Sequence, residues 1–298
     1  MIKVICFGEV LWDKFLTGSK PGGAPMNVAI HLTKQGVDSL LISSVGHDED
    51  GEKLKAFINA KNVSSNYIQL HKSLPTGAVE VALDNEKQAT YTIVNPVAWD
   101  EIQYNQNLNH IVEAADALVF GSLACRREIS RKTLFQLFEF TKLAVFDMNV
   151  RLPHLDFMIL GELLHRCDIL KINEHELEIL IDHFHIEANG LENQLKKLSH
   201  AINTRIICIT LGDKGAAVLD GDSFYNHPGF SVIVADTVGA GDAFLATFLA
   251  GYLRKRPMET VLEESCAIGA FVATKEGANP DYQKDDVFSM PNFNLTKR

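Results

Sequence analysis

The sequence VIVADTVGAGDAFLATFLAG, residues 232–251, decides the fold of this chain. Its first four residues form an apolar run that predicts a β-strand, residues 236–242 form a glycine-rich loop, and residues 243–251 predict an apolar helix. This order places unpaired helix N–H groups and the positive end of the helix dipole at the loop. The stretch therefore predicts an anion-binding site of the kind that holds phosphate groups.

Two features of this loop bear on its chemistry. Gly239 and Gly241 carry no Cβ atom, so the backbone can approach a phosphate closely. Asp242 falls in the first helical turn, where the dipole favours the ionised carboxylate. It can therefore accept a hydroxyl proton as a general base in phosphoryl transfer. The alternative is that Asp242 only caps the helix, and the loop by itself does not separate the two interpretations.

Outward from this stretch, short apolar runs alternate with longer amphipathic segments. This alternation predicts an α/β fold, with a mainly parallel central sheet flanked by helices in a Rossmann-like arrangement. We expect strands at 2–7, 40–45, 117–120, 143–147, 169–172, 205–210 and 216–219, and helices at 27–34, 51–60, 130–141, 174–181, 191–202, 241–253 and 259–273. No internal repeat is visible, so residues 1–298 are expected to form a single α/β domain.

Residues 76–94 break the alternation, because apolar and polar side chains there repeat with a period of two. This pattern predicts an antiparallel hairpin with a turn at 84–87. We expect residues 11–17 and 66–98 to form a small antiparallel β lid over a cleft, and its unpaired edges favour a homodimer. The alternative is a hairpin that extends one edge of the main sheet.

The composition excludes several classes of protein. With 46% hydrophobic and 22% charged residues the chain is globular, and its net charge of −10 disfavours nucleic acid or an anionic membrane as a partner. The longest uncharged helical stretch, 243–253, is too short to span a bilayer. The five cysteines have neither disulfide nor zinc spacing, and no signal peptide is apparent. We therefore expect a cytoplasmic protein with buried thiols.

A second motif, KPGGAPMNVA at 20–29, forms a turn that runs into a helix. Gly22, Gly23, Asn27, Ala29 and Gly36, together with DTVGAGD at 236–242, resemble the two signature motifs of the ribokinase-like (pfkB-type) carbohydrate kinases. Further matches occur at 46–51, 173–176 and 210–215, so the resemblance extends over about residues 1–290. The segments 8–13, 22–25, 95–100 and 147–151 are most similar to fructokinases.

The resemblance implies an ATP-dependent sugar kinase. In such an enzyme Asp242 would be the catalytic base, and the amides of Gly239, Ala240, Gly241 and Asp242 would form the anion hole. The favoured reaction converts D-fructose to fructose 6-phosphate. Ribokinase, nucleoside kinase and 2-keto-3-deoxygluconate kinase activities are alternatives within the family, and a non-catalytic sugar or nucleotide sensor on the same fold is another.

The resemblance also implies the residues that contact the two substrates. The expected sugar-binding residues are Asp13, Gly22, Gly23, Asn27 and Arg151, and the expected ATP-binding residues are Thr210, Gly212, Gly215 and Thr237. From the residues alone, a single aspartate after a strand is usually a turn residue, and an arginine such as Arg151 can equally form a surface ion pair. Lys171, Lys214 and Arg151 are candidates to offset phosphate charge.

Two metal sites follow from the resemblance. Asn173 and Glu176 match a motif that positions Mg²⁺ and the phosphates largely through water. The alternative is a capping box, with Asn173 as the helix N-cap. Asp236, with the segment 274–278 on the opposite side, matches a K⁺ site found in many relatives.

Other enzyme classes lack their motifs in this chain. No Gly-x-Gly-x-x-Gly follows the first strand, which disfavours a nicotinamide-dependent oxidoreductase. Neither a Gly-Lys-Ser/Thr P-loop nor a His-Glu-x-x-His motif occurs, which disfavours P-loop ATPases and zincins.

Overall fold

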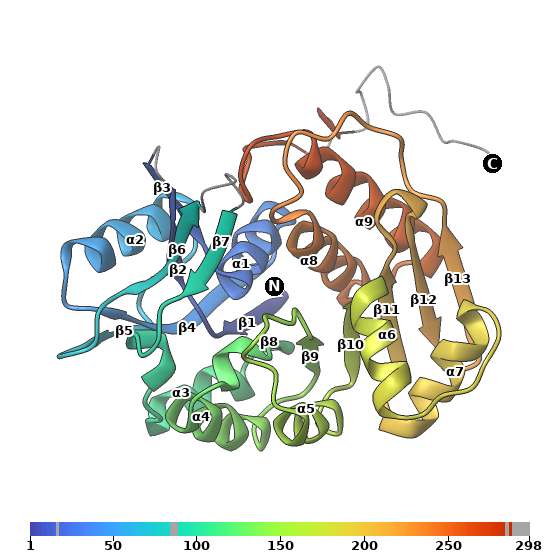
Figure 1. Cartoon of the computed structure of the whole chain (residues 1–298), viewed down its shortest axis with the longest axis horizontal. Coiled ribbons are helices and arrows are strands. Elements are labelled where there is room, and N and C mark those ends of the chain that lie inside the picture. Colours follow the sequence, from blue (N-terminus) through green and yellow to red (C-terminus); the bar gives the residue numbers. More distant parts are fainter. Residues whose placement is uncertain (16–17, 84–88, 284–285, 288–298) are drawn as a thin grey trace.

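The computed structural model of the chain describes residues 1–15, 18–83, 89–283 and 286–287. At its centre lies a nine-stranded sheet with the strand order β13-β12-β11-β10-β9-β8-β1-β4-β5 (Figure 1). The strands are β1 (Lys3–Phe7), β4 (Asp38–Gly46), β5 (Ile68–His71), β8 (Ala117–Gly121), β9 (Ala144–Asp147), β10 (Ile169–Asn173), β11 (Ile206–Thr210), β12 (Ala216–Asp220) and β13 (Ser223–His227). Neighbours from β11 to β5 run parallel, and β12 and β13 pair antiparallel at one edge. The predicted α/β fold is confirmed.

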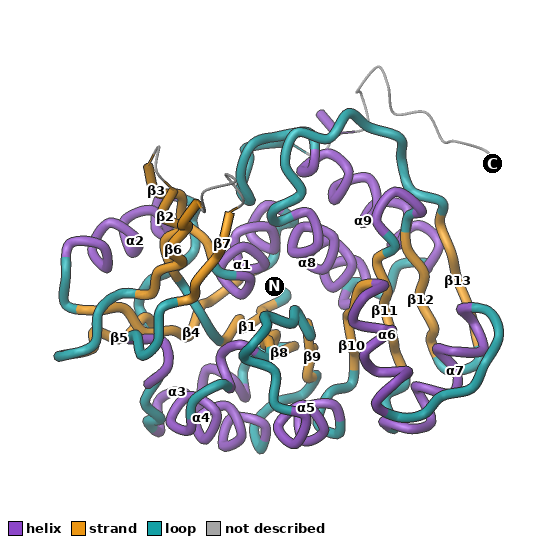
Figure 2. The backbone as a smooth tube through the Cα atoms, viewed as in Figure 1, coloured by secondary structure: helices purple, strands orange, loops and turns teal. Residues whose placement is uncertain are grey.

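Helices cover both faces of this sheet (Figure 2). They are α1 (Ala24–Lys34), α2 (Glu49–Ala60), α3 (Gln106–Glu113), α4 (Glu128–Phe138), α5 (Phe157–Leu164), α6 (Glu174–His183), α7 (Leu191–Ile202), α8 (Ala240–Leu253) and α9 (Met258–Ala273). Alternate residues of a strand enter different cores, as β1 shows: Val4 and Cys6 pack with α1 and α8, whereas Ile5 and Phe7 pack with the apolar faces of α3 to α7.

The apolar run before the glycine loop does not form the predicted strand. Residues 232–235 lie in a loop, where the side chains of Ile233 and Val234 are 84% and 57% exposed. The amides of Ala235 and Asp236 both bond to one carbonyl, that of Ala273 at the end of α9. The run passes the end of a helix instead of pairing along a sheet edge, so its hydrophobicity does not indicate a buried strand.

A second, four-stranded sheet has the order β3-β2-β6-β7. It consists of β2 (Leu11–Phe15), β3 (Gly18–Gly22), β6 (Gly77–Leu83) and β7 (Ala89–Ile93). Its two outer pairs are antiparallel, which confirms the predicted hairpin, and β2 and β6 join them in parallel. The predicted turn at 84–87 and residues 16–17 of the predicted lid lie outside the described residues.

The predicted bounds of this small sheet need two corrections. First, β5 pairs with β4 at the edge of the large sheet, so the start of the range 66–98 belongs to the main sheet. Second, residues 18–22 form β3 and join the small sheet. The sequence of β3, GSKPG, is typical of a turn, and only its pairing with β2 makes it a strand.

A buried ion pair fastens the base of the small sheet. Arg126 donates from Nε to Asp100 Oδ1 at 2.6 Å and from Nη2 to the Val94 carbonyl, just after β7, at 2.7 Å. Its guanidinium also lies 4.0 Å from the ring centroid of Trp99, and the Arg126 and Asp100 side chains are 3% and 0% exposed. These contacts join the hairpin to the 3-10 turn Ala98–Glu101.

Two predictions concern the cysteines and a possible membrane span. All five cysteines are free thiols and buried, as predicted. Within the described part of the chain, no helix combines the length and the apolar character needed to cross a membrane.

We expect Asp100→Ala to lower the free energy of unfolding by about 3–5 kcal/mol, because it leaves a buried guanidinium without its partner. Urea denaturation measures the change. Glu139→Ala is the control, because Glu139 pairs with Arg166 on the surface and such pairs contribute at most about 1 kcal/mol. Equal losses in the two variants would contradict a structural role for the buried pair.

Candidate active site

The predicted anion loop lies at the N-terminus of α8, near the carboxyl ends of β9 and β10 (Figure 1). Gly239 is the N-cap residue and has φ +78°, and a Cβ atom there would lie 2.6 Å from the Cα atom of Ala278. A side chain at this position would therefore be strained and would collide with the segment after α9. The carboxylate of Asp236 ties the same two segments together, because it accepts from the amides of Val238 and Gly277, each at 3.0 Å.

Asp242 projects from the first turn of α8 and is only partly exposed. Its Oδ2 accepts a 2.8 Å hydrogen bond from Nδ2 of Asn27 on α1. Burial and the nearby charge of Asp147 raise the pKa of Asp242 from 3.8 to about 6, although Lys171, the Asn27 amide and Arg151 act in the opposite direction. The helix dipole alone would keep the Asp242 carboxylate ionised, but the effect of burial on its pKa is larger. Asp242 therefore has a pKa suited to proton transfer near neutral pH.

A buried ion pair lies beside the loop. Lys171 on β10 donates to Asp147 on β9 at 3.0 Å, and both side chains are less than 10% exposed. A Cβ atom on Gly241 would lie 3.1 Å from Lys171 Nζ, so the ammonium group is next to the anion loop. Burial opposes its charge, but Asp147, Glu176 and Asp242 together raise the pKa of Lys171. Lys171 can therefore add positive charge to the loop, as predicted for a phosphate-compensating lysine.

Lys214, the other predicted lysine, has a different environment. Its side chain is 69% exposed and pairs with Glu174 at 2.9 Å. Lys214 also lines the cavity that opens beside the anion loop, so its role in offsetting phosphate charge stays a prediction.

Three of the predicted sugar residues lie close together, Asp13 on β2, Gly22 at the end of β3 and Gly23 as the N-cap of α1. A Cβ atom on Gly22 would lie 2.5 Å from Asp13 Oδ2, and one on Gly23, where φ is +118°, would lie 2.4 Å from the carbonyl oxygen of Glu9. Neither position has room for a Cβ atom, so the two glycines let the Asp13 carboxyl and the Glu9 carbonyl lie close to the backbone. Asp13 lies inside β2, so the alternative of a turn residue is wrong. The carboxyl of Glu9 is buried, its Oε2 has no partner among the described residues, and burial raises its pKa to about 7.

Arg151 lies on the exposed loop after β9. Its side chain donates to the carbonyl of the preceding Val150 at 3.0 Å, and no ion pair of Arg151 occurs within the described residues. Burial raises the pKa values of Asp13, Glu9 and Asp242, and the charge of Arg151 opposes each of these shifts. The guanidinium is therefore electrostatically coupled to the three carboxyl groups, which differs from the alternative of a surface ion pair.

A cavity of about 600 Å³ opens beside the anion loop. Its lining includes all four predicted ATP-binding residues, of which Thr237 belongs to the loop, and two further loop residues: Thr210, Gly212, Gly215, Thr237, Ala240 and Gly241. Apolar side chains, among them Val234 and Phe244, complete the wall. A flat apolar group with a polyanionic end fits such a cavity, because the anionic end would face the amides of α8.

Asn173 and Glu176 form the capping box that the sequence offered as an alternative. The Asn173 side chain accepts from the Glu176 amide and the Glu176 carboxyl accepts from the Asn173 amide, both at 2.9 Å. The other Glu176 oxygen accepts from the Val150 amide at 2.8 Å. The described residues contain no group of three or more acidic, histidine or cysteine side chains suited to holding a metal ion. The predicted role of this pair toward Mg²⁺ stays a prediction.

Sequence reasoning missed three polar residues of the site. Asp147 and Glu9 each follow or end a buried strand, and this position at the carboxyl edge of a parallel sheet is a signal that could have found them. Asn279 lies in a loop after α9, yet it donates to Asn27 at 2.7 Å. No local pattern indicates that contact, because the two residues are separated by 252 positions.

We expect Asp242→Asn to raise the free energy of unfolding at neutral pH by about 1–3 kcal/mol. The folded-state pKa of Asp242 lies above its unfolded value, so the wild-type protein loses stability as the pH rises through about 6. The advantage of the variant should vanish below about pH 4, where the carboxyl is protonated in both states. Thermal denaturation across this pH range measures the difference, and a variant less stable than wild type at neutral pH would contradict the prediction.

Comparison with known proteins identifies the family. A family model described as pfkB family carbohydrate kinase matches residues 5–285. An uncharacterized sugar kinase of Pyrococcus horikoshii is 31% identical over 288 residues, which cover 93% of this chain and 88% of the relative. Fructokinase-2 of Solanum lycopersicum is 28% identical over 306 residues, covering 93% and 92%. The structure of a fructokinase from Xylella fastidiosa with bound ATP shares the fold, with a TM-score of 0.83, 21% identity and coverage of 96% and 97%. The chain belongs to the pfkB family of carbohydrate kinases.

Proposed function

We propose that this sugar kinase transfers the γ-phosphate of ATP to D-fructose and releases fructose 6-phosphate and ADP. The observation that carries the proposal is the position of Asp242, whose carboxyl lies in the first turn of α8 while the same turn lines the 600 Å³ cavity. A base and an anion hole on one helical turn are the two elements that phosphoryl transfer needs from a protein.

The proposed reaction begins with a sugar hydroxyl beside Asp242. The carboxylate takes the hydroxyl proton, the sugar oxygen forms a bond to the γ-phosphorus, and the bond between that phosphorus and the β–γ bridging oxygen breaks. The amides of Gly239, Ala240, Gly241 and Asp242 would stabilise the negative charge on the transferring group, with Lys171 behind them. Because Asn27 donates to the carboxylate, one oxygen of Asp242 is held and the other is available for the proton.

The two metal ions belong to this proposal as well. Mg²⁺ would accompany the nucleotide and offset phosphate charge, and Asn173 and Glu176 would contact its water shell, since their side chains already bind backbone amides. K⁺ would lie beside Asp236, whose two oxygens each accept one amide and so retain lone pairs for a cation.

The charges at the sugar end support a neutral sugar. Asp13 and Glu9 are carboxyl groups, and Arg151 is the one cation whose charge acts on both of them. Carboxyl groups accept hydrogen bonds from sugar hydroxyls, whereas they repel a carboxylate or a phosphate on the substrate. This arrangement favours fructose or ribose over 2-keto-3-deoxygluconate. The similarity to Solanum lycopersicum fructokinase-2 supports fructose between those two.

We further propose that the small sheet is the lid of the sugar site, that its edges pair with a second subunit, and that the enzyme acts in the cytoplasm. The small sheet carries two of the proposed sugar-binding residues, Asp13 on β2 and Gly22 on β3, which supports its role as the lid. The outer strands β3 and β7 each have one sheet neighbour among the described residues, and exposed edges of this kind can pair between chains. The buried free thiols fit a reducing compartment.

A panel of fructose, ribose, a purine nucleoside and 2-keto-3-deoxygluconate, each with magnesium ATP and coupled detection of ADP, tests the substrate. We expect the highest kcat/KM for fructose and the lowest for the acidic sugar. A higher value for another substrate would reject fructose. Binding of a sugar without ADP release from any of them would favour the non-catalytic sensor.

Asp242→Asn should lower kcat with the preferred sugar by about 10²- to 10⁴-fold, because the variant has no base for the hydroxyl proton. Calorimetric titration should show that sugar and nucleotide still bind, since asparagine keeps an oxygen for the Asn27 amide. Asp222→Asn, at an exposed position after β12, is the matched control and should keep full activity. Wild-type turnover in Asp242→Asn would remove Asp242 from the mechanism.

A further inference from the structure

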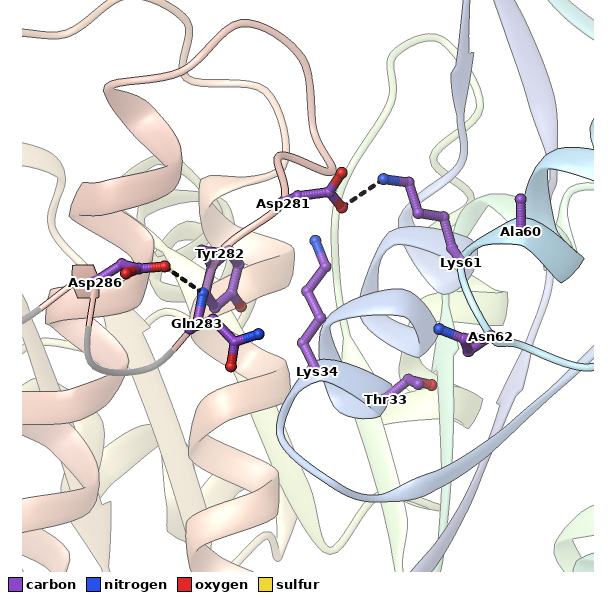
Figure 3. A pocket seen from close by; sticks show the side chains of 9 residues that line it. All are labelled: Thr33, Lys34, Ala60, Lys61, Asn62, Asp281, Tyr282, Gln283 and Asp286. Atoms are coloured by element: carbon purple, nitrogen blue, oxygen red, sulfur yellow. Dashed lines mark hydrogen bonds and ion pairs between the residues drawn. The ribbon is translucent and has the colours of Figure 1, made fainter.

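After α9 the chain returns across α1, and residues 277–283 form what we call the return segment. Three side-chain contacts hold this segment against α1 and the end of α2. His31 Nε2 is 2.9 Å from the Ala278 carbonyl, His31 Nδ1 is 2.9 Å from the Tyr282 hydroxyl, and Lys61 pairs with Asp281 at 2.6 Å. Figure 3 shows the Lys61 and Asp281 side chains pointing toward each other beside a cavity of about 490 Å³. The return segment is therefore held against α1 and against Lys61 after α2.

The return segment is also linked to Asp242 through the side-chain amides of Asn279 and Asn27. Nδ2 of Asn279 donates to Oδ1 of Asn27 at 2.7 Å, and Nδ2 of Asn27 donates to Oδ2 of Asp242 at 2.8 Å. Asn27 is 4% exposed. The three side chains come from the return segment, α1 and α8, so the chain of hydrogen bonds joins three separate parts of the structure.

The direction of these hydrogen bonds follows from the chemistry of an amide. Asn27 has an oxygen that accepts and a nitrogen that donates. While Asn279 donates to the oxygen, the nitrogen of Asn27 faces the carboxylate. If the Asn27 amide turned over, its oxygen would meet the Asp242 carboxylate and its NH₂ group would meet that of Asn279. Both contacts would be repulsive. The Asp242 carboxylate can only accept, so it favours the Asn27 nitrogen, and the hydrogen bond from Asn279 to the Asn27 oxygen holds the amide in that same orientation.

The side chain of Asn279 is in an energetically unfavourable position. Its own side-chain oxygen is buried and has no hydrogen-bond partner among the described residues. An unpaired buried oxygen is unfavourable. The contacts of the return segment with α1 and Lys61 hold the residue in this position, where the one polar contact of its side chain within the described residues is the bond to Asn27.

We propose that Asn279 is a positioning residue for phosphoryl transfer, which orients the Asn27 amide so that its nitrogen donates to Asp242 and keeps the base ionised and correctly placed. This inference rests on the proposed function, because Asn279 acts through Asp242. Asn279 does so without contacting the carboxylate itself in the described structure.

The other charged and titratable groups that face Asp242 lie elsewhere. They are Cys6 on β1, Glu9 after β1, Asp147 on β9, Arg151 after β9 and Lys171 on β10. None belongs to the return segment, so substitution of Asn279 leaves every one of these groups in place. A change in the titration of Asp242 in such a variant would therefore report on the hydrogen bond from Asn27.

The test uses Asn279→Leu, which has the same number and branching of side-chain heavy atoms and no donor, with Asn279→Ala as a second variant in case the larger leucine does not fold. Tyr282→Phe is the matched control, because it removes the hydroxyl contact with His31 from the same segment and leaves the two amides intact. We expect the acidic limb of the kcat/KM pH profile to move upward by about half a unit or more in the Asn279 variants, since a weaker donor raises the pKa of the base. The control should keep the wild-type limb.

A second measurement does not depend on turnover. Carboxyl ¹³C NMR titration of the protein without substrates, with Asp242→Asn used to assign the signal, should show the same upward shift of the Asp242 pKa in Asn279→Leu. If no sugar is phosphorylated, the proposed function fails, and this titration still decides the role of Asn279. An Asp242 pKa that is unchanged from wild type in Asn279→Leu, with a loss of thermal stability similar to that of Tyr282→Phe, would overturn the proposal and leave Asn279 a structural residue.

Discussion

The structure of the site depends on how the N-terminus of α8 is held. Its N-cap, Gly239, packs so closely on Ala278 that no side chain fits between them, and Asp236 binds the amide of Gly277 from the same loop. Contacts with the segment after α9 therefore hold the conformation of the loop. This constraint explains why residues at opposite ends of the chain, Asn27 and Asn279, are both found beside Asp242.

The electrostatics of the cleft follow from its place at the carboxyl ends of the strands. Four carboxyl groups, those of Glu9, Asp147, Glu176 and Asp242, are coupled there to two cations, Lys171 and Arg151. An excess of buried acid raises carboxyl pKa values and makes one member a competent base. The same excess would repel a polyphosphate, and in the proposed reaction helix amides, Lys171 and a divalent ion accompanying the nucleotide would together offset it.

Much of this arrangement could be predicted from the sequence, and the failures have physical causes. The alternation of apolar runs and amphipathic segments predicted the large sheet, because that pattern is dictated locally by burial. The run at 232–235 predicts a strand because it is apolar, yet Ile233 is 84% exposed, and the end of the run bonds to the last turn of α9, a contact that the local sequence does not indicate. The strand β3 was missed for the opposite reason, since pairing with β2 overrides the turn preference of its glycines and proline.

The candidate site also combines features that the local sequence predicts with features that depend on the complete fold. The glycine loop was predictable, and so was the grouping of Thr210, Gly212, Gly215 and Thr237, which line one cavity, because backbone geometry and motif spacing are local properties. The pKa of Asp242 was not, because the helix dipole can be inferred from sequence but the burial of the carboxyl cannot. The contact between Asn279 and Asn27 depends on the complete fold.

The account makes one central claim, that the Asp242 carboxylate activates a sugar hydroxyl beside the α8 amides. A crystal structure of the protein with ADP and fructose tests it most directly. The account predicts that the β-phosphate lies against the amides of residues 239–242 and that a primary hydroxyl of the sugar is within hydrogen-bond distance of Asp242. A complex in which this carboxylate faces away from both ligands would contradict it.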